Sequence, residues 1–161
     1  MDILEVNNQT GIDEIRVLFR EYEAFLDEDL CFQSFEEELA TLPGKYAPPD
    51  GVLLLAMENG QTAGCGALRK INAQTCEMKR LFVRPAFRGR GLGRTLAERL
   101  IAEAVARGYH SMLLDTLEKL TSAVALYKAL GFKPTEPYYG NPLSGVLYWR
   151  LDLTRTSDVI Q

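Results

Sequence analysis

Apolar residues near the start of the chain recur at steps of three and four residues, the spacing of one helix face. The residues that follow this spacing are Ile12, Ile15, Leu18, Phe19, Tyr22, Phe25 and Leu26. They predict a long amphipathic helix, and the apolar residues at 3–6 predict a short strand before it. Ser34 and Glu37 have the spacing of a capping box, so residues 35–42 are predicted as a second, shorter helix. Thr10 is expected to cap the first helix.

Three runs rich in apolar residues occupy the centre of the chain, at residues 52–57, 63–71 and about 76–83. Each run predicts a strand. The segment Glu58-Asn59-Gly60-Gln61 separates the first two runs and has the composition of a hairpin turn. The third run stops at Arg84-Pro85, because proline cannot continue a strand ladder.

The second half of the chain alternates between helical and strand patterns. The apolar positions that fall every four residues are Leu92, Leu96, Leu100 and Ala104. They predict a helix that stops at Gly108. Residues 111–114 predict a short strand, residues 122–130 a helix, and two last strands are predicted near Phe132 and at 146–153. This order of elements is typical of a mixed α/β protein.

Length and composition indicate one domain that spans residues 1–161. The chain has 161 residues, shows no internal repeat, and its 47% hydrophobic content is enough for one core. Only residues 43–51, rich in proline and glycine, are linker-like.

The net charge of -4 gives no general attraction for nucleic acid. No run approaches the roughly 20 apolar residues that span a bilayer, and no signal peptide is evident, so we expect a soluble cytoplasmic protein without a membrane partner.

The cysteines and the single histidine give little support for a metal site. Cys31, Cys65 and Cys76 have no CxxC spacing, and His110 is the only histidine. We therefore expect no metal and interpret the cysteines as reduced thiols that pack as small apolar groups.

Residues 88–94 carry the strongest chemical signal, at the point where a predicted strand gives way to a predicted helix. The segment reads Arg88-Gly89-Arg90-Gly91-Leu92-Gly93-Arg94. The glycines let backbone amides approach a ligand, the arginines add positive charge, and the first turn of a helix has unpaired N–H groups. We therefore expect a pyrophosphate site. In a plain turn the three arginines would repel one another without a counter-anion.

Two other nucleotide-binding motifs do not fit this turn. A dinucleotide-binding GxGxxG motif that began at Gly89 would need glycine or alanine where Arg94 stands. A P-loop would need Gly-Lys followed by serine or threonine, which is absent from the chain.

Three features resemble the GNAT superfamily of N-acetyltransferases, which transfer the acetyl group of acetyl-CoA to amines. Arg88, Gly91 and Gly93 meet the superfamily signature Arg/Gln-x-x-Gly-x-Gly/Ala, directly after a Leu-x-Val-x-Pro segment at residues 81–85. Residues 123–132 resemble the family ending Leu-Tyr-x-x-x-Gly-Phe. The third feature is the order of elements, with two early helices before a central sheet. The resemblance extends over nearly the whole chain.

The resemblance implies a GNAT-type α/β fold with acetyl-CoA as co-substrate. The fold would have a mostly antiparallel twisted sheet of about seven strands flanked by about four helices, splayed between the strands that end at Val83 and Leu114. Backbone amides of residues 88–94 would hold the CoA pyrophosphate. Main-chain groups of Leu81, Phe82 and Val83 would pair with the pantetheine arm, as in β-augmentation. A backbone N–H near Phe82 or Val83 could also polarise the thioester carbonyl.

Tyr127 and Glu77 are the predicted catalytic side chains. Tyr127 would protonate the leaving CoA sulfur, because a tyrosine with a pKa of about 10 holds its proton at neutral pH. Its alternative role is that of a core residue on an amphipathic helix. Glu77 would take a proton from the amine; some superfamily members have a base glutamate six residues before the residue that Val83 matches. Its alternatives are an ion pair with Lys79 or Arg69, and a water chain as the base.

The geometry of a regular strand decides what shares a face with Glu77. Glu77, Lys79, Leu81 and Val83 would lie on one face unless a bulge changes the alternation, and Cys76 would point to the opposite face. One family feature is missing: Leu120 stands where many members have an asparagine that contacts the cofactor. We expect Thr121 or Ser122 to cap the following helix instead.

The acceptor is expected to be a small-molecule or peptide amine, and the sequence does not name it. In the superfamily the acceptor pocket lies between the first two helices and the loop between the last strands. The residues available there are Tyr22, Glu23, Asp27, Glu28 and Asp29 on one side and Tyr138, Tyr139 and Asn141 on the other. The acidic group would suit a cationic amine, although an exposed helix end is the commoner reason for such a group. A catalytically idle acyl-CoA-binding module is the alternative function, and we expect a monomer or a homodimer.

Overall fold

A computed structural model describes residues 1–30 and 34–154 of the chain. Within these residues, seven strands form one sheet in the order β1-β2-β3-β4-β5-β7-β6. The strands are β1 (Asp2–Glu5), β2 (Val52–Glu58), β3 (Gln61–Asn72), β4 (Thr75–Val83), β5 (Ser111–Leu117), β6 (Lys133–Pro134) and β7 (Val146–Asp152). The helices are α1 (Gln9–Leu26), α2 (Phe35–Ala40), α3 (Leu92–Ala106) and α4 (Thr121–Ala129), with short 3-10 helices η2 (Gly44–Tyr46) and η3 (Pro85–Phe87). The predicted mixed α/β fold is confirmed.

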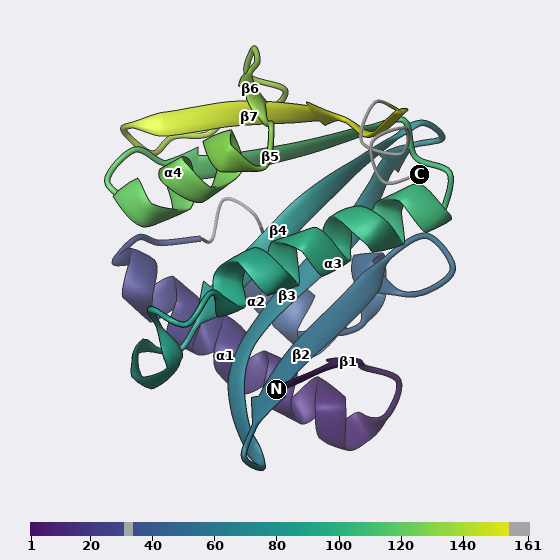
Figure 1. Cartoon of the computed structure of the whole chain (residues 1–161), viewed down its shortest axis with the longest axis vertical. Coiled ribbons are helices and arrows are strands. Elements are labelled where there is room, and N and C mark those ends of the chain that lie inside the picture. Colours follow the sequence, from purple (N-terminus) through teal and green to yellow (C-terminus); the bar gives the residue numbers. More distant parts are fainter. Residues whose placement is uncertain (31–33, 155–161) are drawn as a thin grey trace.

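Helices cover both faces of the sheet. Figure 1 shows α3 crossing in front of β3 and β4, while α1 and α2 lie behind the sheet. Two clusters of buried apolar side chains match these two layers. Successive side chains of a strand point to opposite faces, so Leu54 of β2 joins the cluster on the α3 side and its neighbours Leu53 and Leu55 join the one on the α1 side.

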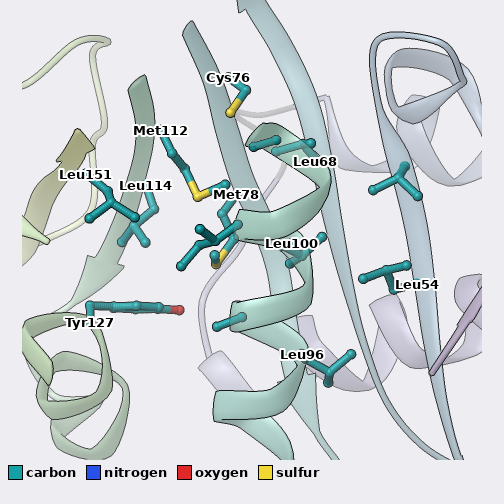
Figure 2. Close-up of a cluster of buried hydrophobic side chains, with 14 of the residues drawn as sticks. Leu54, Leu68, Cys76, Met78, Leu96, Leu100, Met112, Leu114, Tyr127 and Leu151 are labelled. Atoms are coloured by element: carbon teal, nitrogen blue, oxygen red, sulfur yellow. The ribbon is translucent and has the colours of Figure 1, made fainter. Parts of the chain in front are cut away.

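The cluster on the α3 side explains the four-residue spacing seen in the sequence. Figure 2 shows Leu96 and Leu100 of α3 projecting towards the sheet, with Met78 of β4 and Met112 of β5 in the same layer. Cys76 also points into this cluster, and its thiol is buried. It therefore faces away from the side that carries Glu77, as predicted. Cys31 lies outside the described residues.

The predicted helix caps are wrong, although the helices themselves form. In α1 the capping side chain is Asn8, whose oxygen accepts from the N–H of Gly11 at 2.8 Å, and Thr10 lies inside the first turn. Ser34 precedes α2 in the left-handed region at φ 56°, and its side chain makes no capping bond. Capping serines usually need extended backbone geometry. In the described structure Leu120 precedes α4 without a side-chain cap, and Thr121 is already helical.

One buried side chain, that of Tyr46, anchors the otherwise largely exposed residues 43–51 to the helical layer. They contain η2, and the side chain of Tyr46 is only 1% exposed. The Tyr46 ring meets Phe19 of α1 edge-on, with 6.1 Å between ring centroids. The proline and glycine content therefore marks a turn that is held by one buried side chain, with its prolines exposed at the surface.

The sheet opens between β4 and β5, as the family resemblance implied. These parallel strands pair only at Thr75↔Ser111, Cys76↔Met112 and Glu77↔Leu113. Beyond that point β4 stays paired with β3, and β5 stays paired with β7. Figure 1 shows β4 and β5 diverging from the upper right of the view. One side of β4 after Glu77 is thus without a strand neighbour in the described sheet.

A bulge in β4 changes which side chains share a face. Cys65 of β3 pairs with Phe82, while Ala67, two residues on, pairs with Lys79, three residues back. Arg80 absorbs the extra residue at a positive φ of 61°. Glu77 therefore does not share a face with Leu81 and Val83, which was expected only for a strand without a bulge.

The consequence of the bulge is that Lys79 and Arg80 both face the α1 and α2 side. Arg80 binds a glutamate of α2, while Leu81 and Val83 pack against the cluster on the α3 side. Sequence alternation alone would have placed Arg80 opposite to Lys79.

No helix within the described ranges is long and apolar enough to cross a membrane.

Candidate functional site

An open cleft of about 430 Å³ lies where β4 and β5 have parted. Its walls are the end of β4, the turn before α3, the first half of α4 and part of α1. The predicted site residues that line it are Leu81, Phe82, Val83, Arg88, Gly89, Gly91, Leu92, Gly93 and Tyr127. Arg90 and Arg94 belong to the same turn but stand outside the lining. The structure thus brings the two sequence motifs to one cleft.

The turn before α3 has the backbone geometry that an anion site needs. Gly89 and Gly91 adopt positive φ values of 79° and 77°. A Cβ added at either position would meet nothing within 4 Å, so the conformation, and not lack of space, favours glycine there. α3 begins at Leu92, and the N–H groups of its first turn have no partner within the helix. These features fit the pyrophosphate of a bound CoA.

Each arginine of the turn has a partner within the chain. Arg88 lies over the Phe25 ring at 4.4 Å and donates from Nε to the carbonyl oxygen of Val83 at 2.9 Å. Arg90 and Arg94 form ion pairs with glutamates of β2 and α3, at 3.2 and 3.5 Å. Mutual repulsion of the arginines therefore does not by itself require a bound anion. The glycine geometry is the stronger argument for the site.

The unpaired side of β4 offers main-chain groups to the cleft. Leu81, Phe82 and Val83 line it, and β5 has already diverged at this point. An extended chain with amide groups can pair with such an edge. The carbonyl of Val83 already accepts from Arg88, but a carbonyl oxygen can accept two hydrogen bonds. The edge is thus compatible with the predicted pantetheine contact.

Tyr127 occupies the junction between the open cleft and a second, deeper space. Its side chain is 7% exposed and packs edge-on against Phe132, with ring centroids 5.7 Å apart. In Figure 2 the ring extends from α4 towards β4, with the hydroxyl directed to the Met78 side of the opening. Burial raises the pKa of the Tyr127 phenol above its ordinary value, so it holds its proton at neutral pH.

The second space, the inner cavity, has a volume of about 60 Å³ and lies between the diverging strands. Lys79 and Arg80 of β4 and Asp115 of β5 line it, together with Tyr22 of α1. Tyr127 lines both the inner cavity and the open cleft, so the two spaces meet at its side chain.

Asp115 is held in place by the loop before β7. Its Oδ2 accepts from the hydroxyl of Tyr139 and, at 3.2 Å, from Nδ2 of Asn141. Asn141 Nδ2 also lies 2.8 Å from the Tyr139 hydroxyl. Burial, followed by the charge of Asp115, raises the pKa of Tyr139, so this hydroxyl stays a donor. Three residues from one strand and one loop thus form a fixed polar group at the inner cavity.

Arg80 is committed to an ion pair. Its Nε and Nη2 each donate to Glu38 of α2 at 3.0 Å, and both side chains are almost fully buried. Lys45 lies 3.1 Å from the same glutamate. The pair therefore fixes α2 against the bulge of β4.

Glu77 is buried and already has two hydrogen-bond donors. Arg69 Nε donates to its Oε1 at 2.7 Å, and the Tyr138 hydroxyl donates to its Oε2 at 2.6 Å. Burial would raise the pKa of Glu77, but the charges of Lys79 and Arg69 and these hydrogen bonds outweigh it and hold that pKa below its ordinary value. Glu77 lines neither the open cleft nor the inner cavity.

The acidic residues at the end of α1 lie apart from this site. Glu23, Asp27, Glu28 and Asp29 line a shallow hollow on the surface, without any residue of the open cleft. Lys119 connects this end of α1 to the cleft, because it donates to Leu26 O at 2.8 Å and to Glu28 at 3.2 Å.

Of the residues that the sequence offered for an acceptor pocket, Tyr22 and Asn141 line the inner cavity. Sequence reasoning missed Asp115 and treated Lys79 only as a partner of Glu77. The signal for Asp115 was its place directly after the predicted strand at 111–114, although β5 in fact continues through it to Leu117.

Among residues 1–30 and 34–154, no three histidine, cysteine, aspartate or glutamate side chains gather closely enough to hold a metal ion.

Comparisons with known proteins give one consistent result. Residues 12–132 match the Acetyltransferase (GNAT) family. An uncharacterized N-acetyltransferase of Schizosaccharomyces pombe is 45% identical over 157 residues, which cover 96% of each chain. The crystal structure of an acetyltransferase from Streptococcus agalactiae superposes with a TM-score of 0.77 at 27% identity, over 94% of this chain and 97% of that one.

A further solved structure carries the donor molecule. The yncA protein of Salmonella typhimurium, solved with its cofactor acetyl-CoA, has a TM-score of 0.73 at 24% identity. The similarity covers 95% of this chain and 94% of that protein. At this identity the likeness supports a common fold.

Proposed function

The chain belongs to the GNAT family of acetyltransferases and uses acetyl-CoA as its donor, and we propose that it transfers the acetyl group directly to a primary amine of a small molecule or peptide. One observation carries this proposal: Tyr127 lines both the open cleft and the inner cavity. An acid at this junction lies within reach of a donor in the cleft and an amine in the cavity. Direct transfer in a ternary complex needs this meeting of two spaces.

Backbone groups hold the donor in this proposal. The amides of residues 88–94 bind the pyrophosphate, and Leu81, Phe82 and Val83 pair with the pantetheine arm. Acetyl-CoA supplies an acetyl group activated as a thioester. An N–H near Phe82 or Val83 stabilises the oxyanion that forms at the carbonyl, an interaction worth about 3 to 4 kcal/mol per good donor in other enzymes.

Tyr127 manages the proton of the leaving group. A bond forms between the amine nitrogen and the carbonyl carbon, the carbon–sulfur bond breaks, the amine loses one proton and the sulfur gains one. Tyr127 donates a proton to sulfur as the bond breaks, and the base that takes the amine proton returns a proton to the phenol, through water, after the transfer. Its buried phenol is protonated at the start, which this role requires.

Glu77 is the proposed base, on the condition that the amine proton can reach it. Its lowered pKa keeps the carboxylate ionised, as a base requires, but Arg69 and Tyr138 already donate to both oxygens. Since Glu77 lines neither space, the amine proton would have to reach it through the Tyr138 hydroxyl or water. A water chain without Glu77 is the alternative.

The proposal is tested with purified protein in two steps. Acetyl-CoA should raise the melting temperature, because binding to the folded state stabilises it. Release of free thiol is then measured with polyamines, amino acids, aminoglycosides and lysine peptides. Binding without thiol release from any amine would favour the idle acyl-CoA-binding module. If neither acetyl-CoA nor CoA changes the melting temperature, the assignment of the donor site is wrong.

A further inference from the structure

The inner cavity carries opposite charges on its two strands, Lys79 on β4 and Asp115 on β5, next to Tyr127. We infer that the acceptor is an amine that also carries a carboxylate, of the amino-acid class, with Lys79 binding the carboxylate and Asp115 the ammonium group. This inference rests on the proposed function and names the substrate class of the same site. It differs from the sequence-based idea of a cationic amine drawn to the acidic end of α1.

Lys79 has the burial expected of a group that meets an anionic ligand. Its side chain is close to fully buried, and burial, followed by the neighbouring charge of Arg80, lowers the pKa of Lys79 to about 8. A buried ammonium of this kind is destabilised unless negative charge is near. A carboxylate in the cavity supplies that charge. The ammonium has three donor hydrogens, so it can bind the ligand and a partner within the protein together.

The charges around Lys79 leave the cavity wall on the β4 side positive. The charged and titratable groups that surround Lys79 are Glu77 and Arg80 on β4, Asp115 on β5, Glu38 on α2, Lys45 on η2, Tyr22 on α1 and Tyr127 on α4. Two of the three carboxylates are bound to other cations: Glu38 to Arg80 and Lys45, and Glu77 to Arg69. Of these three carboxylates, Asp115 is the one without an ion pair within the described residues, and it stands on the other strand.

Asp115 is arranged to receive the amine. Tyr139 and Asn141 both approach its Oδ2, and none of the hydrogen bonds within the described residues uses Oδ1. An ammonium can therefore bind the second oxygen without displacing either donor. The two donors also fix the position of the carboxylate, which lowers the entropy lost on binding.

The size and lining of the cavity set a limit on the acceptor. About 60 Å³ admits a head group of a few atoms, not an extended polyamine. Apart from the polar residues, the walls are largely leucines of α1, β5 and the neighbouring loops, including Leu26, Leu117 and Leu143. Burial of an extended cation there would leave its charges without partners, which is unfavourable. An amino-carboxylate places both of its charges on the polar groups.

The inference is tested with three forms of each acceptor: free L-amino acids, their carboxamides, and the corresponding amines without the carboxyl group. Thiol release is measured for the wild type and for Lys79→Met, with Lys45→Met as control. Lys45 belongs to the same charge cluster but lies outside the cavity lining. We expect kcat/KM for the best free amino acid to exceed that for its carboxamide by about tenfold to a hundredfold, the range for a hydrogen bond between charged groups.

The variants should separate binding from structure. Lys79→Met should reduce this preference to about one, while Lys45→Met should keep it. In the wild type the preference should decline as the pH rises through about 8, because Lys79 then loses its charge, and Lys79→Met should show no such decline. If Lys79 were only a structural cation, Lys79→Met should lower the melting temperature. If Lys79 binds the ligand, Lys79→Met should not lower it, because a buried charge with a lowered pKa does not stabilise the folded protein.

The outcomes distinguish this inference from the proposed function. Thiol release that is equally fast with carboxamides and simple amines would leave the acetyltransferase function intact and overturn the carboxylate. A preference that survives in Lys79→Met would overturn the role of Lys79. Absence of thiol release with every amine would instead contradict the proposed function itself.

Discussion

The open cleft and the inner cavity adjoin at Tyr127 but are built in different ways. The cleft combines two short stretches of the chain, within 81–83 and 88–93, with residues of α1 and the first half of α4, and its proposed contacts with the donor come mainly from backbone groups of the two stretches. The inner cavity takes side chains from α1, β4, β5, α4 and the loop before β7. Recognition by backbone groups leaves a local sequence motif, whereas recognition by converging side chains leaves none.

The residue shared by both regions gives the largest expected effect. Tyr127→Phe should lower kcat by about 10² to 10⁴, the usual contribution of a general acid, and should leave the affinity for acetyl-CoA nearly unchanged. Initial rates at saturating acetyl-CoA and a thermal-shift titration measure the two quantities. Tyr109→Phe is the control, because it removes another buried hydroxyl, bonded to Asp50 O, outside both spaces. Unchanged turnover of Tyr127→Phe with a good acceptor would remove Tyr127 from the mechanism.

The next variant tests whether the chemistry extends beyond the two spaces. If Glu77 accepts the amine proton through Tyr138, Glu77→Gln and Tyr138→Phe should each lower kcat by about 10², the lower end of the range for general bases. Because the pKa of Glu77 lies below its ordinary value of 4.5, the midpoint of the rate loss due to its protonation should lie below that pH. An acidic limb well above pH 4.5 that persists in Glu77→Gln would point to a different base.

The donor region alone is tested by two glycines at opposite ends of α3. Gly91 and Gly108 have φ values of 77° and 83°, and a Cβ at either would meet nothing within 4 Å. Alanine at either position should cost about 1 to 2 kcal/mol of folding free energy. Only Gly91→Ala should also weaken acetyl-CoA binding, by about tenfold, because relief of the strain moves the amides of the turn. Equal loss of affinity in both variants would indicate a general effect of stability.

The sequence predicted the fold well and singled out a turn whose backbone geometry fits an anion site, for physical reasons that concern particular residues. The steps of four from Leu92 to Ala104 reflect burial against the sheet, and they gave α3 nearly its full length. The caps at Thr10 and Ser34 were wrong, because a capping residue is chosen by backbone geometry that the residue type does not determine. Elements were thus predicted better than their ends.

The acceptor region could not be predicted to the same depth. The positive φ of Arg80 at the bulge places Lys79 and Arg80 on the same side, which alternation along a strand would not suggest. Asp115 becomes part of a site only because Tyr139 and Asn141, more than 20 residues later, bind it. Such positions depend on tertiary contacts, so the motif that identifies the donor says little about the acceptor.

The smallest expected effect comes from Arg90, which shares the turn but stands outside the lining of the open cleft. Its side chain is 56% exposed and pairs with Glu58 at 3.2 Å, so it can attract the donor only through solvent. Arg90→Gln should therefore weaken acetyl-CoA binding by about twofold to fivefold at low salt, the range of exposed charge pairs, and the difference should vanish as salt is added. Arg99→Gln is the control, because Arg99 has a similar ion pair with Glu103 on α3, away from the turn. A salt-independent loss in Arg90→Gln would show that Arg90 contacts the donor directly, and the separation between backbone and side-chain recognition would then not hold for the cleft.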